Sequence, residues 1–339
     1  MKEKIILIRT ALALAFVLSG CDYKPRAGGV ENQLHVVVSF EDRPHVKAVI
    51  DSVFGRAFYT PAPETYFDIT YIDPFEFSSV KRSHNLLVIS VLGIPDTTAD
   101  RIARSMLPSA QLDLAAGGNN QVFSTRDYFA RGQVFSLVVG KDPNDLIRGL
   151  RDRGTWLFQQ YDKAFLERQK EHVFKRREEK QLSAELWEKY HWRLRIQHDY
   201  VVIREEPERN FVWIGRSFPY RWFSVNWIDK PRSKELDQLM VTELVNDFPM
   251  AYYDKIRFTD VYQRAEPIDL GEWKAWRVEG LWEHNEEVKG GPFISYVFYD
   301  GKSDRLFHIN LLVHSPGQKK IISLRQMEIM VHTFSTEAG

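Results

Sequence analysis

The stretch from residue 273 to residue 313 reads WKAWRVEGLWEHNEEVKGGPFISYVFYDGKSDRLFHINLLV, and it decides the fold of the second half of the chain. It holds three apolar, aromatic-rich runs typical of strands, at 273–282, 293–299 and 306–313. The pair Asp300-Gly301 joins the second run to the third, and an Asp-Gly pair is a strong hairpin signal. The stretch therefore predicts three consecutive antiparallel strands.

The segments around this stretch extend the pattern. Further strands are predicted at 200–203, 211–214 and 222–228, where apolar and aromatic residues cluster. Helices are predicted at 236–248 and 323–334, because their apolar residues recur at spacings of three and four. The second half is therefore expected to be a sheet with packed helices.

The first half combines the same kinds of element. Apolar runs predict strands at 35–40, 67–72, 86–92, 121–123 and 134–139. A helix is predicted at 44–54, and a much longer one after Asp142-Pro143. Asp142 suits the N-cap and Pro143 the first helical position, and an apolar stripe follows. The long helix runs into a mixed charged stretch at 175–180.

These elements predict an α+β fold of two domains, each a mostly antiparallel sheet with packed helices, joined by a long charged helix. The expected parts are a signal peptide at 1–20, a polar tether at 21–33, an N-terminal domain at 34–180 that ends in the long helix, and a C-terminal domain at 181–339. The length of 339 residues and the 44% hydrophobic content are sufficient for two ordinary globular domains.

The start of the chain predicts export and lipid attachment. Three basic residues precede the apolar stretch 11–18, and Leu18-Ser19-Gly20-Cys21 follows. This ending resembles the lipobox of bacterial lipoproteins, which implies cleavage before Cys21 and acylation of its thiol and new amino group. The apolar stretch is shorter than the roughly 20 residues that span a bilayer. We therefore expect a membrane partner, held through lipid on Cys21.

Charge and cysteine content exclude several classes of function. Removing residues 1–20 takes away three basic residues and one acidic residue, so the net charge changes from +0 to −2. No basic field remains to favour nucleic acid as a partner. Cys21 is the only cysteine, so its acylation leaves no thiol for a disulfide, a thiolate nucleophile or cysteine-bound zinc.

Several segments resemble an uncharacterised family of Bacteroidota lipoproteins, defined only as a domain of unknown function. The similar segments are Asn32-Gln33-Leu34 through Val38, Arg82–Leu86, Gly280-Leu281-Trp282, Gly290-Gly291-Pro292-Phe293 through Tyr296, Asp300, His314-Ser315-Pro316, Met327-Glu328 and His332-Thr333-Phe334. Lys289 departs from the family pattern, which has an apolar residue, often Met, before the double glycine. The resemblance implies an α+β envelope lipoprotein and supplies no activity.

The residues after Cys21 bear on which membrane holds the lipid anchor. Asp22 after the lipidated cysteine resembles the inner-membrane retention signal of enteric bacteria, a rule that need not hold in Bacteroidota. The tether also lacks the acidic run associated there with surface export. We expect the periplasmic side of the outer membrane, with the inner membrane as the alternative.

The C-terminal strands offer a candidate catalytic group. Arg277 and Glu279 share one face of their strand, and His308 and Asn310 share one face of theirs. If these strands are neighbours, the four side chains can gather on one side, as an acid–base or anion site. The alternative is a half-solvated sheet face that bears cross-strand polar pairs. Strand parity alone does not decide which residues pair.

Other chemistry has little support in the sequence. His308 and His314 are six residues apart, which fits no compact pair of metal ligands, so no metal site is predicted. No nucleophile elbow, dinucleotide fingerprint or phosphate loop occurs, so no cofactor is predicted. Gly290-Gly291-Pro292 has a structural interpretation, a tight turn at the start of a strand, and an alternative one, an anion-binding loop.

Aromatic residues suggest binding. Six tryptophans lie between residues 213 and 282, and the densest aromatic segment is 218–223. The candidate binding residues are Tyr220, Trp222, Phe223 and Trp282. The leading hypothesis is therefore a non-enzymatic envelope lipoprotein that binds a protein partner or an envelope polymer. The alternative is a lipid-tethered hydrolase or transferase that uses Glu279 and His308.

Overall fold

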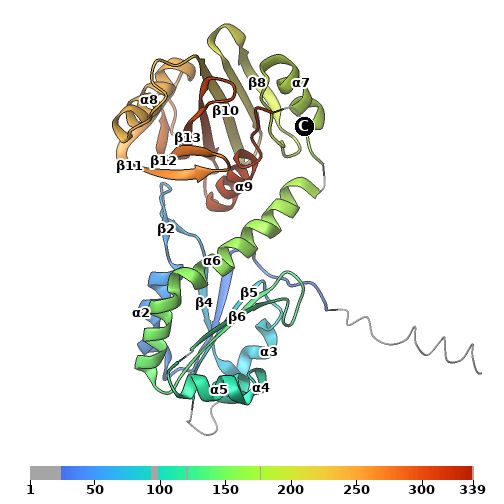
Figure 1. Ribbon diagram of the computed structural model, residues 1–339, viewed down its shortest axis with the longest axis vertical. Coiled ribbons are helices and arrows are strands. Elements are labelled where there is room, and N and C mark those ends of the chain that lie inside the picture. The colour runs from blue at the N-terminus through green and yellow to red at the C-terminus, as the bar shows by residue number, and fades with distance from the viewer. Residues whose placement is uncertain (1–23, 93–97, 120, 176, 338–339) are drawn as a thin grey trace, which may run out of the picture. The chain divides into compact units, whose positions relative to one another are not determined.

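The computed structural model describes residues 24–92, 98–119, 121–175 and 177–337 (Figure 1). The predicted signal peptide and Cys21 lie outside the described residues. The chain forms two compact units. The first unit comprises the chain up to Val49 together with Ile69–Tyr161, and the second comprises Ile50–Asp68 together with Asp162–Gly339. The long helix α6 (Pro143–Lys175) contributes to both units.

The first unit is built on a five-stranded sheet with the order β4-β1-β5-β7-β6. Its strands are β1 (Gln33–Val37), β4 (Asp68–Ile72), β5 (Asn85–Val91), β6 (Val122–Arg126) and β7 (Val134–Gly140). β1 and β7 both pair with β5 in parallel, and β6 pairs with β7 antiparallel. The expectation of a mostly antiparallel sheet therefore does not hold in this unit.

The central position of β5 explains this parallel pairing. Every residue of β5 and of β7 is buried. A strand covered on both faces is continuously apolar, and parallel strands need crossover connections that place helices over the sheet. The run at 86–92 has this continuous apolar character.

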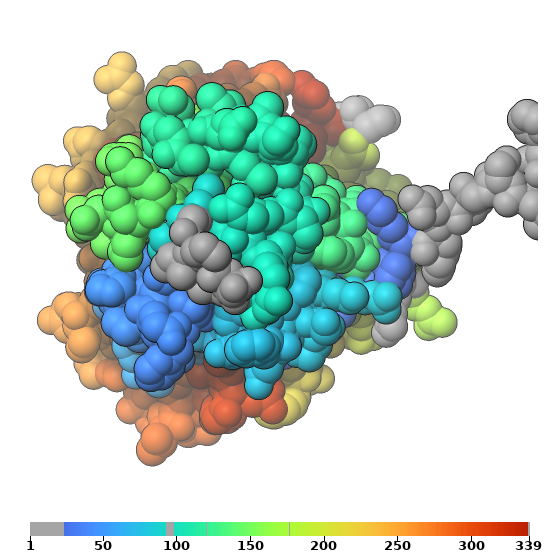
Figure 2. Space-filling view, turned by 90° about the horizontal axis from the view of Figure 1, so that it is seen from below, coloured from blue at the N-terminus to red at the C-terminus, as the bar shows by residue number. Residues whose placement is uncertain are grey.

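Several helices accompany the first sheet. They are α2 (Arg43–Phe54), η1 (Pro74–Glu76), α3 (Phe77–Val80), α4 (Thr98–Met106), α5 (Ser109–Ala116) and the first part of α6. Figure 2 views the end of this unit where α4 and α5 in blue-green and α2 in blue form the surface. At the start of α6, the Asp145 backbone N–H donates to Asp142 Oδ1 at 3.0 Å, which confirms the predicted N-cap.

The first described residues are fixed to this unit by backbone hydrogen bonds. The Ala27 N–H donates to the Arg131 carbonyl at 2.9 Å, and the Gly28 N–H donates to the Arg82 carbonyl at 3.1 Å. In return, the Arg131 N–H donates to the Pro25 carbonyl at 2.8 Å. The segment predicted as a tether is thus part of the folded unit from Pro25 onward.

The second unit is built on a seven-stranded sheet with the order β11-β12-β13-β14-β10-β9-β8. Its strands are β8 (Val201–Glu206), β9 (Phe211–Arg216), β10 (Tyr220–Asp229), β11 (Ile256–Leu270), β12 (Trp273–His284), β13 (Gly290–Asp300) and β14 (Arg305–His314). All neighbouring pairs are antiparallel. The two-domain α+β fold and the antiparallel C-terminal sheet are therefore as predicted.

Each face of this sheet is covered by one apolar cluster. Phe307, Ile309 and Leu311 pack on one face with α9 (Ile321–Val331), and Leu306 and Leu312 pack on the other with α8 (Gln238–Tyr252). The remaining elements are α7 (Lys180–Tyr190), η2 (Pro207–Arg209) and the hairpin of β2 (Ala57–Phe58) and β3 (Glu64–Thr65). The predicted strand parity is thus confirmed, and the sheet is an interior layer.

Gly291 sits where the backbone of two strands comes very close. A Cβ at this position would lie 1.9 Å from the Val313 carbonyl oxygen and 3.1 Å from Trp282 Nε1. Gly291 is not among the described residues with positive φ. Close packing therefore explains this glycine, and Lys289 lies in the exposed link before it, where no core packing is affected.

Within the described residues, no helix combines the length and the apolar character needed to cross a bilayer.

Candidate functional site

Arg277 and Glu279 lie on the α9 face of the sheet, within a cluster of charged and phenolic side chains that we name the Arg277 network. Arg277 Nη1 donates to Glu279 Oε2 at 2.7 Å, and Arg277 Nε donates to Glu328 Oε1 at 3.0 Å. The Tyr296 hydroxyl donates to the same Glu328 oxygen at 2.7 Å, and the Tyr262 hydroxyl donates to Glu279 Oε1 at 3.0 Å. Four elements are linked, namely β11, β12, β13 and α9.

Opposite charges dominate the electrostatics of the Arg277 network. Burial alone would raise the pKa of Glu328, but the positive charge of Arg277 and the hydrogen bond from Tyr296 outweigh it, so the pKa is lowered. Burial opposes the charge on Arg277, yet Glu328, Tyr296 and Glu279 raise its pKa. Glu328 and Arg277 therefore stay ionised, and the donors and acceptors of the network are directed at one another.

His308 lies on the opposite face of the sheet from Arg277 and Glu279. In the register, Arg277 pairs with Tyr296 and Tyr296 with Ile309, so the odd-numbered residues of β14 share the face of Arg277. His308 and Asn310 point instead toward α8, where the His308 ring lies 4.2 Å from the Phe248 ring. The expected gathering of these four side chains is thus corrected by the pairing register.

Asn310 belongs to a separate hydrogen-bonded group on the α8 face. Its Oδ1 accepts from the Tyr253 hydroxyl at 2.9 Å, and its Nδ2 donates to Ser295 Oγ at 2.6 Å. Tyr253 and Ser224 hydroxyls are 2.6 Å apart. Buried polar groups of this kind satisfy one another within the core.

The burial of His308 predicts a dependence of stability on pH. Burial lowers its pKa from 6.5 to about 3, so the folded protein holds this ring neutral. The unfolded chain binds the proton near pH 6.5, and the contribution is therefore fully present above pH 6.5 and lost as the pH falls toward 3. We expect a loss of about 1.4 kcal/mol per pH unit within that window.

A comparison with His308→Phe isolates this contribution. Urea unfolding at pH 7, 6, 5 and 4 should give a steeper decline for the natural chain than for the variant, because only the natural chain has the titrating ring. The difference between the two slopes is the measured quantity, so a constant offset from repacking is irrelevant. Parallel pH profiles would contradict a buried, neutral His308.

The predicted aromatic residues separate into two groups. Tyr220, Trp222 and Trp282 lie on the α8 face, where ring centroids are 5.8 Å apart for Tyr220–Trp222 and 5.5 Å for Trp222–Trp282. Phe223 is on the other face and has no exposed surface. Trp282 is only 2% exposed and Tyr220 is 40% exposed. Of the four, Phe223 and Trp282 therefore have no surface to offer a partner in this state.

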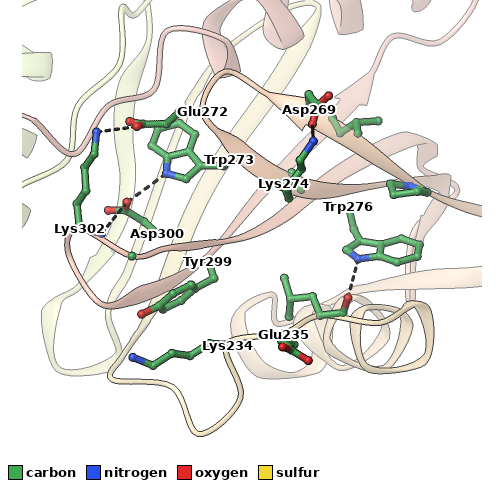
Figure 3. Close-up of a pocket in the computed structure, with 15 residues that line it drawn as sticks. Lys234, Glu235, Asp269, Glu272, Trp273, Lys274, Trp276, Tyr299, Asp300 and Lys302 are labelled. Carbon is green, nitrogen blue, oxygen red and sulfur yellow. Dashed lines mark hydrogen bonds and ion pairs between the residues drawn. The ribbon is translucent and has the colours of Figure 1, made fainter.

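A large groove lies at another end of the same sheet, and we name it the Trp276 groove (Figure 3). Its volume is about 970 Å³. It is formed by the segment before α8, the β11–β12 turn and the β13–β14 hairpin, and its labelled residues are Lys234, Glu235, Asp269, Glu272, Trp273, Lys274, Trp276, Tyr299, Asp300 and Lys302. All of them belong to the second unit.

The three aromatic rings of the Trp276 groove are held by their polar edges. Trp276 Nε1 donates to the Leu236 carbonyl at 3.2 Å, and Trp273 Nε1 donates to Asp300 Oδ1 at 3.2 Å (Figure 3). The Tyr299 hydroxyl donates to Asp304 Oδ1 at 2.7 Å. The Trp273 ring also lies 4.8 Å from the Phe298 ring, within the cluster on the α9 face. The apolar surfaces left for a ligand are therefore those of the half-buried Trp276 and Tyr299.

Charged side chains surround these rings as neutralised pairs. Lys274 Nζ lies 2.5 Å from Asp269 Oδ1, and Lys302 Nζ lies 2.6 Å from Glu272 Oε2 (Figure 3). Such exposed pairs contribute little to stability. They do provide many hydrogen-bonding atoms without a strong net field, which suits an uncharged polar ligand better than an ion.

Sequence reasoning missed most of these residues. Trp273 and Trp276 were counted among the six clustered tryptophans but were not named as binding residues, and Tyr299 was predicted only as part of a strand. Glu328 lies on the predicted helix at 323–334 and in the family-like segment, so that segment was its signal. Among the described residues, no group of three or more His, Cys, Asp or Glu side chains is arranged to hold a metal ion.

Comparisons with known proteins follow the two halves of the chain. Residues 27–174 match the family model "Domain of unknown function (DUF8532)", and residues 179–333 match "Domain of unknown function (DUF4837)". An uncharacterised domain family is thereby supported for each half, whereas the lipobox and the bacterial group stay predictions. The Trp276 groove and the Arg277 network both lie in the DUF4837 match.

Solved structures resemble the chain only distantly. A Bacteroides thetaiotaomicron protein matches at 10% identity and TM-score 0.28, covering 44% of this chain and 46% of its own, so less than half of that protein is spanned. The Saccharomyces cerevisiae Ran-binding protein Mog1p matches at 10% identity and TM-score 0.30, with coverages of 43% and 90%. LpqN, involved in cell envelope biogenesis of Mycobacterium tuberculosis, matches at 10% identity and TM-score 0.27, with coverages of 42% and 82%.

TM-scores of 0.27 to 0.30 are too low to establish a shared fold. No curated protein matches the chain.

Proposed function

We propose that this protein is a lipid-anchored protein of the cell envelope whose DUF4837 domain binds an envelope polysaccharide in the Trp276 groove. The anchor would be Cys21, and the periplasmic side of the outer membrane is the favoured location. The role is binding rather than catalysis. The observation that carries the proposal is a groove of about 970 Å³ in which the rings of Trp276 and Tyr299 are held by hydrogen bonds from their polar atoms.

Saccharides match this groove in both chemistry and size. Their C–H faces pack on flat aromatic surfaces, while their hydroxyl groups need donors and acceptors at the rim. Trp276 and Tyr299 provide the flat aromatic surfaces. The exposed carboxylate of Glu235 and the pair Lys274–Asp269 provide the donors and acceptors. The groove is at the upper end of the ~300–1,000 Å³ range of ligand pockets, which favours several sugar units.

Arrangement within the domain also favours binding over an acid–base reaction. Glu279 accepts hydrogen bonds from Arg277 and Tyr262. His308 lies on the opposite, α8 face of the sheet with its ring against Phe248. A Glu279–His308 pair therefore does not form, and the hydrolase or transferase that relied on this pair is not proposed.

Replacing Trp276 with alanine should weaken polysaccharide binding. We expect at least a tenfold loss of affinity, or about 1.4 kcal/mol, because a stacked indole at a binding centre is a typical hot spot. The measurement is cosedimentation of the mature protein with purified peptidoglycan sacculi and, separately, with outer-membrane polysaccharide. Trp156→Ala is the matched control, since Trp156 is 39% exposed in the other unit.

A milder variant guards against a folding defect. Glu235→Gln keeps the size of an exposed side chain and should reduce binding without changing the melting temperature. If neither polysaccharide is retained by the natural protein, or if Trp156→Ala loses as much as Trp276→Ala, the binding role is wrong. Mass spectrometry of the native product tests the anchor separately, because acylated Cys21 must be its first residue.

A further inference from the structure

A second cavity of the second unit, here named the Arg325 pocket, lies beneath α9 and beside the second part of α6. Its volume is about 560 Å³, well within the ~300–1,000 Å³ range of small-ligand sites. Lys163 and Lys170 of α6, Ile268 of β11, and Arg325 and Ile329 of α9 line it. It shares Arg277 and Glu328 with the Arg277 network, whereas Ile268 is the one lining residue that it shares with the Trp276 groove.

Arg325 is the buried charge that defines this pocket. Its side chain is 4% exposed, and Nη2 lies 2.5 Å from Asp162 Oδ1. The guanidinium carbon is 4.4 Å from the centre of the Phe165 ring and 5.1 Å from that of Tyr66. Stacking between two rings and pairing on one side fix the plane of the guanidinium group.

The other end of this guanidinium lacks an acceptor. Nη1 of Arg325 is buried, and among the described residues none accepts a hydrogen bond from it. A buried donor without a partner is costly, and more so on a charged group. Because Arg325 lines the cavity, an oxygen of a molecule inside it is the natural partner for this donor.

The surroundings favour an anionic head and an apolar body. The wall carboxylates of Glu266 and Glu328 lie against Arg277, and Asp162 lies against Arg325. Lys163, Glu167 and Lys170 are exposed at the rim, so the rim has two positive charges and one negative charge. The apolar lining is formed by Leu166, Ile268 and Ile329.

We propose that the Arg325 pocket binds a small amphipathic anion, with its carboxylate or phosphate oxygens on Arg325 Nη1 and its apolar chain along α6 and α9. A bidentate contact is not required, because one oxygen on Nη1 completes the hydrogen bonding of the side chain. This site is independent of the polysaccharide groove and of the lipid anchor.

Three matched probes test the proposal by isothermal titration calorimetry on the mature protein. Decanoate, used below its micelle concentration, has both a head and a chain, decanol has the chain alone, and acetate has the head alone. We expect saturable decanoate binding with one site, at least tenfold tighter than decanol, and no measurable acetate binding. Equal affinities for decanoate and decanol, or no saturable decanoate binding, would overturn the proposal.

Variants locate the site. Arg325→Lys keeps the charge but removes the guanidinium donor, so decanoate affinity should fall at least tenfold while decanol is unaffected. Arg257→Lys, an exposed arginine of β11, is the control and should change nothing. Should Arg325→Lys not fold, Lys170→Gln at the exposed rim should still weaken decanoate threefold or more. If decanoate binding is unchanged in whichever of these two variants folds, the assignment of the site is wrong. Trp276→Ala, in the other groove, should leave decanoate binding unchanged.

Discussion

Replacing Arg277 with methionine is expected to lower the free energy of unfolding of the second unit by about 3–5 kcal/mol. The guanidinium is the only cation within hydrogen-bonding distance of both Glu279 and Glu328 among the described residues. Its loss leaves two carboxylates of low exposure, 9% and 16%, without their counter-charge. Breaking one partner of a buried ion pair has this large effect because the remaining charge keeps its desolvation cost.

Urea unfolding, monitored by tryptophan fluorescence, measures this loss of stability in the second unit. The chain has nine tryptophans, and Trp156 is the one that lies outside the second unit. Arg257→Met is the matched control, since Arg257 and Glu283 form an exposed pair. The control should change stability by less than about 1 kcal/mol. A similar small effect for Arg277→Met would mean that the network contributes nothing to the attachment of α9.

Gly291→Ala is expected to destabilise the same unit by about 3 kcal/mol, at the upper end of overpacking effects. The added Cβ would fall 1.9 Å from the Val313 carbonyl oxygen, so the two strands must separate. That carbonyl also accepts from Trp282 Nε1 at 3.3 Å, and the indole would have to move as well. Because backbone atoms are involved, rotation of a side chain cannot relieve the clash.

Gly301→Ala provides the control for this prediction. Gly301 has negative φ, and the nearest atom to its added Cβ is Tyr299 Cε1 at 3.8 Å, an ordinary contact. The control should therefore unfold within about 0.5 kcal/mol of the natural chain. If the two alanine variants unfold at the same urea concentration, the close approach of β13 and β14 is not tight in solution.

Local patterns predicted most elements of the second unit but not how they pair. Arg277 and Glu279 were assigned to one face of β12, and the structure agrees, since the two side chains form a hydrogen bond. The error lay in matching β12 to β14 across β13, since parity defines two faces and leaves their mutual register open. One residue of register decides whether His308 joins Arg277 or faces α8.

The elements that were missed have weak patterns. β11 (Ile256–Leu270) is a long edge strand with polar residues on both sides and a change of register between Phe258 and Gln263, so no alternation is visible. α4 and α5 are short, and a helix of that length has few periodic positions to detect.

Both candidate sites depend mainly on contacts between residues that are distant in sequence. Arg325 lies 163 positions from Asp162, and Trp276 donates to a carbonyl at Leu236. Neither spacing leaves a local motif. The parts that sequence could predict were the aromatic richness of the C-terminal domain and the presence of Arg277 and Glu279 on one face.

The hydrogen bonds that hold Pro25, Ala27 and Gly28 to the first unit have a consequence for the proposed anchor. Only the backbone between Cys21 and Lys24 is then left to bridge lipid and folded protein. Three residues reach at most about 10 Å. An acylated Cys21 would therefore hold the first unit close to the lipid headgroups and restrict the distance at which it could meet a partner.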